Sequence, residues 1–88
     1  AGSLFKNPKN NSAGKLLDLA GLKGFSIGDA KISEKHANFF INDGDASSRD
    51  MLMLIKKAHK EVKDKFNVNL SLEVKLMGFN KEEIEGLC

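Results

Sequence analysis

Residues of the types that most often do chemistry are few in this chain, and their spacing matches no common catalytic or metal-binding motif. Two histidines and one cysteine occur among the 88 residues, namely His36, His59 and Cys88. Imidazole and thiolate groups bind zinc, but the spacing of these three fits no common zinc site. A P-loop and a G-x-S-x-G turn are also missing. Ser3 and Glu73, taken singly, are typical of a terminal turn residue and a solvent-facing residue. Spacing alone leaves the chemistry open.

The composition predicts one small soluble domain. Hydrophobic residues make up 41% and charged residues 30% of the sequence, with a single proline. No apolar run reaches the roughly 20 residues that span a bilayer, and a net charge of +2 is too weak to indicate nucleic-acid binding. The single cysteine is the last residue, and residues 1–6 lack the apolar stretch of a signal peptide. We therefore expect a cytoplasmic protein whose partners include neither nucleic acid nor membrane.

Short elements are expected in the first half of the chain. Residues 3–6 are suited to a short strand, and Ser12 is suited to cap a helix. Apolar residues then follow at the i, i+3, i+4, i+7 spacing of a one-sided helix, namely Ala13, Leu16, Leu17 and Ala20. Gly21 stands where a left-handed cap would end this helix. Three apolar stretches follow, and we expect strand structure in residues 25–27, 30–32 and 38–42.

A long helix is the clearest prediction. Ser47 and Asp50 have the spacing of a capping box, and His59 lies beside the apolar stripe formed by Met51, Leu52, Leu54, Ile55, Ala58, Val62 and Phe66. The opposite side carries five lysines: Lys56, Lys57, Lys60, Lys63 and Lys65. A solvated helix face explains these lysines. An acidic or nucleic-acid partner is the alternative, although no aromatic residue lies among them to stack on bases.

The period of the pattern changes from 3.6 to 2 after Asn67. Apolar and other residues alternate over residues 68–77, which predicts a half-buried strand. The order of elements is therefore strand, helix, strands, long helix and strand. This order predicts an α+β domain of two layers, with a mixed or antiparallel sheet packed against one long and one short helix.

Several multi-residue motifs carry a resemblance to one family. They are Gly2-Ser3-Leu4-Phe5-Lys6-Asn7-Pro8, Ser12-Ala13-Gly14, Ala20-Gly21-Leu22-Lys23-Gly24, Ile27-Gly28, Ser33-Glu34-Lys35-His36-Ala37-Asn38-Phe39, and Glu73-Val74-Lys75 with Gly78. In this order they resemble the C-terminal domain of UDP-N-acetylenolpyruvoylglucosamine reductase (MurB), and the short connection after Pro8 looks like its type II branch. The resemblance implies that residues 1–88 form the substrate-binding domain, with the FAD-binding domains outside this chain.

The sequence departs from the family pattern at three places. Gly28-Asp29 stands where Gly-Gly is common, Leu72 where proline is common, and Lys75 where arginine is common. Asp29 implies that the backbone here does not require the second glycine. Lys75 keeps the charge of arginine but loses its two-pronged bonding to a carboxylate.

The resemblance also implies an activity and two catalytic residues. In the family, NADPH reduces FAD, and the reduced flavin delivers hydride to C3 of the enolpyruvyl group of UDP-N-acetylglucosamine enolpyruvate, a step of peptidoglycan synthesis. Ser3 matches the general acid that protonates C2. A hydroxyl is a weak acid, but a carbanion-like centre is basic enough to accept its proton where the geometry is fixed. Glu73 matches the carboxylate near the substrate carboxylate, where a protonated or proton-sharing group would stabilise the enolate.

Three further residues match positions that contact the UDP part of the substrate: Asn7, Lys23 and His36. Lysine suits phosphate as a point charge, and an amide suits phosphate or pyrimidine edges. The alternatives are a hydrogen-bonded core histidine at His36, beside Phe39, and a solvated loop lysine at Lys23. For the chain as a whole, the alternative to a reductase domain is a free-standing α+β binding module without catalysis.

Overall fold

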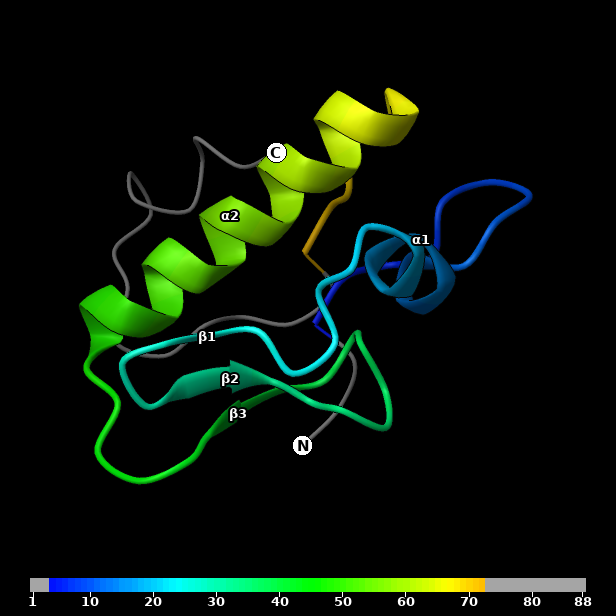
Figure 1. Ribbon diagram of the computed structural model, residues 1–88. Helices are drawn as coiled ribbons and strands as arrows, with labels where there is room; N and C mark the ends of the chain where they lie inside the picture. Colours follow the sequence, from blue (N-terminus) through cyan, green and yellow to red (C-terminus); the bar gives the residue numbers. More distant parts are fainter. Residues whose placement is uncertain (1–3, 73–88) are drawn as a thin grey trace.

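The computed structural model describes residues 4–72, and these form two layers. The elements follow in the order α1 (Ala13–Leu19), β1 (Ser26–Ile27), β2 (Ala30–Ile32), β3 (Phe40–Asn42) and α2 (Ser48–Phe66). The strands form an antiparallel sheet of order β1-β2-β3, and α2 lies across the sheet (Figure 1). The predicted α+β class and the antiparallel sheet are confirmed. The short helix α1 packs against α2.

The long helix α2 begins and ends as its sequence predicts. The Ser47 hydroxyl accepts a hydrogen bond from the Asp50 amide at 3.0 Å, and the Asp50 carboxylate accepts one from the Ser47 amide at 3.4 Å. This capping box fixes the first turn. The predicted stripe faces the core, where Leu54, Ile55, Ala58 and Val62 are buried. Within residues 4–72, no helix is long and apolar enough to cross a membrane.

The short helix α1 is held at both ends by local hydrogen bonds. The Ser12 hydroxyl accepts from the Lys15 amide at 3.2 Å. After the helix, Gly21 has a φ of +79°, the Gly21 amide donates to the Asp18 carbonyl at 2.9 Å, and the Leu22 amide donates to the Leu17 carbonyl at 3.1 Å. This pair of bonds is the Schellman motif, for which glycine is favoured because it has no Cβ. The predicted glycine cap is therefore confirmed.

The turn between β1 and β2 explains one departure from the family pattern. Ile27 pairs with Ala30 across a two-residue turn, in which Gly28 has a φ of +57° while Asp29 is not among the residues with positive φ. Glycine is therefore required only at the first position, as expected. The Asp29 carboxylate accepts from the Asp45 amide at 2.9 Å, so this aspartate also organises the turn after β3.

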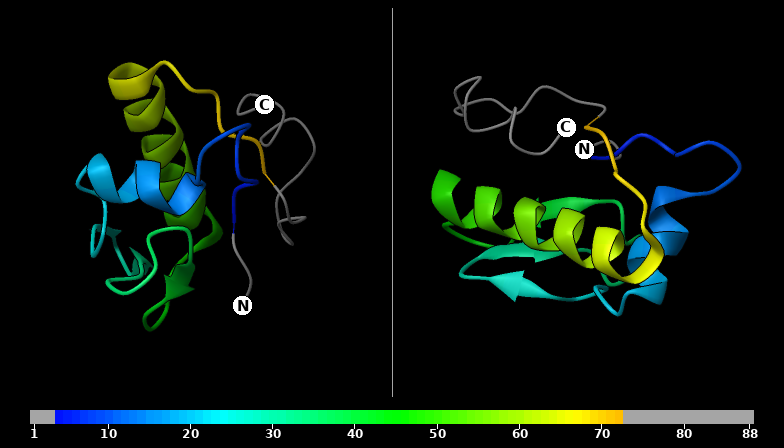
Figure 2. Two further views of the ribbon diagram at one scale, coloured as in Figure 1. Left: turned by 90° about the vertical axis from the view of Figure 1, so that its right-hand side faces the viewer. Right: turned by 90° about the horizontal axis from the view of Figure 1, so that it is seen from above.

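The predicted strands over residues 3–6 and 68–77 are only partly formed among the described residues. Leu70 is buried while Asn69 and Ser71 are exposed, so the predicted alternation of burial holds. Within residues 4–72, however, the two segments pair through a single antiparallel bridge between Phe5 and Leu72. It brings the two segments side by side, as both views in Figure 2 show. On one side of this bridge, the first segment ends at the turn that begins at Pro8, where the Asn11 amide donates to the Pro8 carbonyl. The rest of the second predicted strand lies outside the described residues.

Candidate functional site

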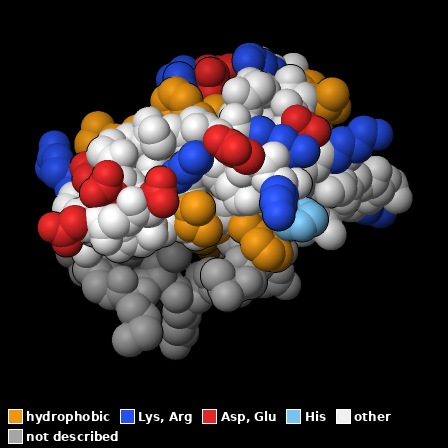
Figure 3. Space-filling view, turned by 60° about the horizontal axis from the view of Figure 1, so that its bottom comes forward, with side chains coloured by type: hydrophobic (Ala, Val, Ile, Leu, Met, Phe, Trp, Pro, Cys, Tyr) orange, Lys and Arg blue, Asp and Glu red, His pale blue; other side chains and the backbone are white. Residues whose placement is uncertain are grey.

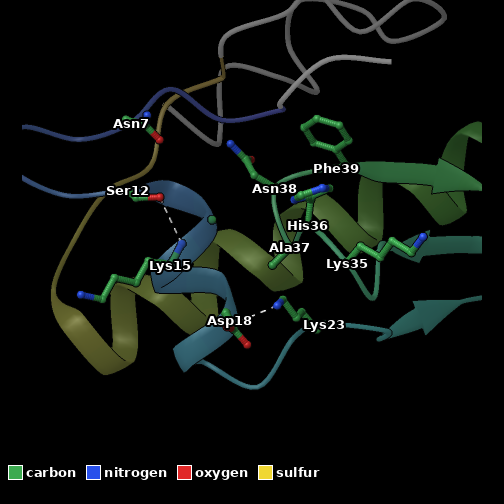
Figure 4. Close-up of a pocket in the computed structure, with 11 residues that line it drawn as sticks. Asn7, Ser12, Lys15, Asp18, Lys23, Lys35, His36, Ala37, Asn38 and Phe39 are labelled. Atoms are coloured by element: carbon green, nitrogen blue, oxygen red, sulfur yellow. Dashed lines mark hydrogen bonds and ion pairs between the residues drawn. The ribbon is translucent and has the colours of Figure 1, made fainter.

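One open cavity of about 430 Å³ collects the residues expected to bind the substrate. Asn7, Lys23 and His36 all line it, although they come from three separate segments. The other lining residues are Ser12, Gly14, Lys15, Asp18, Lys35, Ala37, Asn38 and Phe39. Figure 4 shows α1 on one side, residues 35–39 on the other, Asn7 at one end and the Asp18–Lys23 pair at the opposite end. The structure therefore brings the three predicted residues into one site.

Asn7 connects the N-terminal segment to α1. Its side-chain oxygen accepts a hydrogen bond from the Ala13 amide at 3.0 Å. This amide is one of the helix N–H groups that have no partner within the helix. Because the oxygen is used in this way, the amide nitrogen of Asn7 is the group that the side chain offers to a ligand.

Lys23 lies in the loop after α1 and is ion-paired. Its Nζ lies 3.4 Å from a carboxylate oxygen of Asp18, and both side chains are partly exposed. The loop itself is fixed by backbone bonds, because the Gly24 amide donates to the Ile32 carbonyl at 2.9 Å. The ammonium group is therefore held at the rim of the cavity by a weak ion pair that an anionic ligand can replace.

His36 lies in a tight loop before β3. The Ser33 hydroxyl accepts from the Lys35 and His36 amides at 3.1 and 3.3 Å. The His36 ring packs against the Phe39 ring with centroids 5.4 Å apart. The residue is nevertheless exposed, so the alternative of a core histidine at this position is wrong. The loop presents the imidazole to the cavity as a hydrogen-bonding group.

The cavity has an excess of positive charge. Three lysines (Lys15, Lys23, Lys35) and one aspartate (Asp18) line it, a formal sum of +2 with the histidine neutral. Lys15 and Lys35 were not singled out from the sequence, although Lys35 is adjacent to His36 and Lys15 to the Ser12 cap. On the face shown in Figure 3, acidic side chains lie among the basic ones.

Four of the five α2 lysines have partners of their own, and one of them, Lys63, donates to the Asn67 side-chain oxygen at 2.9 Å. Lys57 pairs with Glu61 at 3.3 Å, Lys60 pairs with Asp64, and the Lys65 ammonium donates to the Ala20 carbonyl at 2.9 Å. Hydrogen bonding to Asp64 raises the pKa of Lys60. These contacts accord with a solvated helix face.

The sequence did not identify Asn38 as a site residue, although it lines the cavity. The residue is 7% exposed. Its side chain accepts from the Phe5 amide at 2.9 Å and donates to the Phe5 carbonyl at 2.8 Å. Asn38 and Phe5 are 33 positions apart, so no local sequence pattern predicts their contact. The only indication in the sequence was a polar asparagine next to apolar residues.

The second histidine, His59, lies apart from the residues that line the cavity. It is half-buried on α2, and its Nε2 atom is buried without a hydrogen-bond partner. Burial lowers the pKa of His59, and the charge of Lys63 acts in the same direction, while the Leu70 carbonyl partly opposes them. Cys88, the third member of the metal set considered above, lies outside the described residues. Among residues 4–72 no cluster of three metal-ligating side chains occurs.

Ser3 and Glu73 also lie outside the described residues. The segment that follows Ser3 and the segment that precedes Glu73 are described, and these two segments lie next to each other. Phe5 forms the bridge with Leu72, and the Lys6 amide donates to the Ser71 carbonyl at 2.8 Å. The described chain therefore joins the segment that follows Ser3 to the segment that precedes Glu73.

The fold and the cavity define a small two-layer α+β domain with an open, lysine-lined pocket. The family model for "UDP-N-acetylenolpyruvoylglucosamine reductase, C-terminal domain" matches residues 1–77. The chain is 51% identical over 80 residues to UDP-N-acetylenolpyruvoylglucosamine reductase 2 of Symbiobacterium thermophilum. It is 48% identical over 81 residues to the reductase of Bacillus subtilis. The chain therefore belongs to the family of UDP-N-acetylenolpyruvoylglucosamine reductase C-terminal domains.

The solved structures agree with this assignment. The crystal structure of the reductase from Thermus caldophilus matches with a TM-score of 0.71 and 43% identity, over 84% of this chain and 26% of that one. The two sequence matches cover 91% and 92% of this chain but only 26% and 27% of the relatives. The chain thus spans about a quarter of the length of the relatives. A free-standing module is not favoured, because these relatives carry the same domain within a reductase.

Proposed function

We propose that this chain is the substrate-binding and proton-donating domain of a UDP-N-acetylenolpyruvoylglucosamine reductase. The observation that carries the proposal is the convergence of Asn7, Lys23 and His36 on one cationic cavity in a chain of this family. The reaction of the full-length protein would reduce the enolpyruvyl group of UDP-N-acetylglucosamine enolpyruvate to the lactyl ether, for peptidoglycan synthesis in the cytoplasm. The single cysteine of the chain accords with that compartment.

The cavity supports a role in holding the diphosphate. A diphosphate diester carries two negative charges, and the lining side chains sum to +2. Lys23 would exchange Asp18 for a phosphate oxygen, while His36 and the Asn7 amide would donate hydrogen bonds to phosphate or uracil. A cavity of about 430 Å³ lies within the usual range for a small-molecule site.

The residues of this chain do not fit as the FAD site. The sequence contains no G-x-G-x-x-G turn to cradle a dinucleotide, and among the described residues that line the cavity the aromatic rings are those of His36 and Phe39 alone. We therefore assign FAD, and the NADPH that would reduce it, to the rest of the full-length protein. That part is also the partner of this domain, and hydride transfer would take place there.

This chain would contribute the proton. Ser3 would donate it to C2 of the enolpyruvyl group, and Glu73 would stabilise the charge that develops on the neighbouring carboxylate. The bridge between Phe5 and Leu72 supports this pairing, because it ties together the segments that carry the two residues.

A titration tests the proposed site. Backbone amide spectra of the ¹⁵N-labelled chain would be recorded with UDP-N-acetylglucosamine added up to millimolar concentration. We expect shifts at Asn7, Lys23 and His36, with Asn42 and Lys56 as controls outside the cavity. Shifts spread evenly over the chain, or none at all, would contradict the proposal. Affinity that falls steeply with salt for DNA or RNA would instead favour the lysine-rich helix as a nucleic-acid site.

A further inference from the structure

Asn38 is the one buried polar side chain among residues 4–72. Both of its functional groups bond to the same distant residue: the oxygen accepts from the Phe5 amide at 2.9 Å, and the nitrogen donates to the Phe5 carbonyl at 2.8 Å. The Asn38 backbone carbonyl also accepts from the Leu4 amide at 2.8 Å. Three hydrogen bonds from one residue therefore fix the two positions that follow Ser3.

These bonds have a geometry that few side chains provide. The amide of asparagine holds a donor and an acceptor at one end, so it pairs with both polar groups of Phe5 as a residue on a neighbouring strand would. The opposite edge of the same segment bonds to the second half of the chain, where Lys6 donates to Ser71. The segment is thus held from both edges. A segment held in this way has little freedom to shift along its length.

The same asparagine belongs to the wall of the cavity. Its neighbours His36, Ala37 and Phe39 line the cavity with it. In Figure 4 the Asn38 side chain points toward the N-terminal segment that carries Asn7. The loop is rigid, because the Phe39 amide donates to the His36 carbonyl at 2.9 Å and the Ser33 amide to the Phe39 carbonyl at 2.8 Å. The loop that lines the cavity is therefore the same loop that holds Leu4 and Phe5.

We propose that Asn38 is a positioning residue that fixes Leu4 and Phe5, the residues directly after Ser3, relative to the cavity. This inference rests on the proposed function, in which Ser3 donates the proton. Both ends of the Asn38 amide are bonded to Phe5, so the side chain is committed to the backbone of this segment. It acts through the backbone of Leu4 and Phe5, and its loss would misplace the donor while the lysines of the cavity keep their places.

The test uses the full-length protein and follows the two half-reactions separately. For Asn38→Ala, we expect flavin reduction by NADPH within about twofold of the parent. Reoxidation by the enolpyruvyl substrate should slow on the order of 10- to 100-fold, the cost of a donor misplaced by about 1 Å. Substrate affinity should change by less than about threefold, since the cationic residues remain. Asn42→Ala is the matched control, because Asn42 also accepts two backbone amides, those of Gly44 and Ala46, outside the cavity.

Asn38→Asp keeps the test informative where the alanine variant fails to fold. A neutral carboxylic acid can accept from the Phe5 amide and donate to the Phe5 carbonyl, whereas a carboxylate cannot donate. The reoxidation rate of Asn38→Asp, divided by that of the parent at each pH, should therefore rise as the pH is lowered. A flat ratio, or equal slowing of both half-reactions, would overturn the inference. A parent protein that the enolpyruvyl substrate does not reoxidise would refute the proposed function instead.

Discussion

Replacing Lys23 by methionine should weaken binding of the enolpyruvyl substrate by a calculable amount. A hydrogen bond from a charged group contributes about 1.5–3 kcal/mol. In the free protein, Lys23 lies 3.4 Å from Asp18, with the two side chains 38% and 54% exposed. Such an exposed ion pair contributes about 0.2–1 kcal/mol, which binding must replace. The net loss for Lys23→Met is therefore about 0.5–2.8 kcal/mol, or about 2- to 100-fold in Kd.

Replacing Asp18, the ion-pair partner of Lys23, should have the opposite effect on substrate affinity. Asp18→Asn removes the carboxylate that competes with phosphate for Lys23. Substrate should then bind more tightly, by up to about fivefold, because at most ~1 kcal/mol of ion pairing is no longer displaced. Lys56→Met is the matched control, since this lysine is exposed on α2 and does not line the cavity.

Isothermal titration of the full-length protein with the enolpyruvyl substrate, in the absence of NADPH, measures all three variants. Repeating the titration at higher salt separates direct contacts with the substrate from long-range attraction by the overall charge, because salt screens the interactions between exposed charges most strongly. Two results would refute the reasoning. One is an equal effect of Lys23→Met and Lys56→Met. The other is weaker binding by Asp18→Asn, which would mean that the pair positions the loop and does not compete with the ligand.

Three other expectations follow from the described residues. Burial lowers the pKa of His59 below its ordinary value of 6.5, so the unfolded state takes up a proton more readily than the folded state does. The free energy of unfolding should therefore keep its full value above pH 6.5. It should fall as the pH drops below 6.5, by at most about 1.4 kcal/mol per pH unit. Chemical denaturation between pH 7.5 and 5.5 should show this extra loss in the parent and not in His59→Gln, and identical profiles would contradict it. Gly28→Ala should cost about 1–2 kcal/mol for its positive φ, and more because the new Cβ would clash with the Asp50 carboxylate. A melting temperature equal to that of the parent would argue against this cost, and Gly14→Ala, where the new Cβ meets only ordinary contacts, is the control. The isolated chain should purify without flavin absorbance, and a stoichiometric yellow complex would show that it holds FAD alone.

The parts of the fold that depend on local rules were predictable from the sequence. The Ser47–Asp50 capping box and the Gly21 cap each involve residues within a few positions of one another, so their spacing is visible in the sequence. The burial alternation after Asn67 was visible for the same reason. The pairing of that segment with Phe5 was not visible, because Phe5 and Leu72 are far apart in the sequence and no periodicity encodes their contact.

The site was predictable only where residues matched family motifs. Asn7, Lys23 and His36 were identified in that way, and the structure places them around one cavity. The two-sided bond between Asn38 and Phe5 spans 33 positions, and no periodicity encodes a contact of that range. Lys15 and Lys35 were missed because an isolated lysine is most often solvated, and only the folded chain shows that the two share a cavity with Lys23.

The most direct test of the account measures the two half-reactions of the full-length protein by anaerobic stopped-flow absorbance, for the parent and for Ser3→Ala. The account predicts that NADPH bleaches the flavin equally fast in both. Addition of UDP-N-acetylglucosamine enolpyruvate should then reoxidise the parent rapidly and the variant far more slowly, because only the proton donor has been removed. Equal rates of reoxidation, or equal loss of both half-reactions in the variant, would contradict the assignment of this domain as the source of the proton.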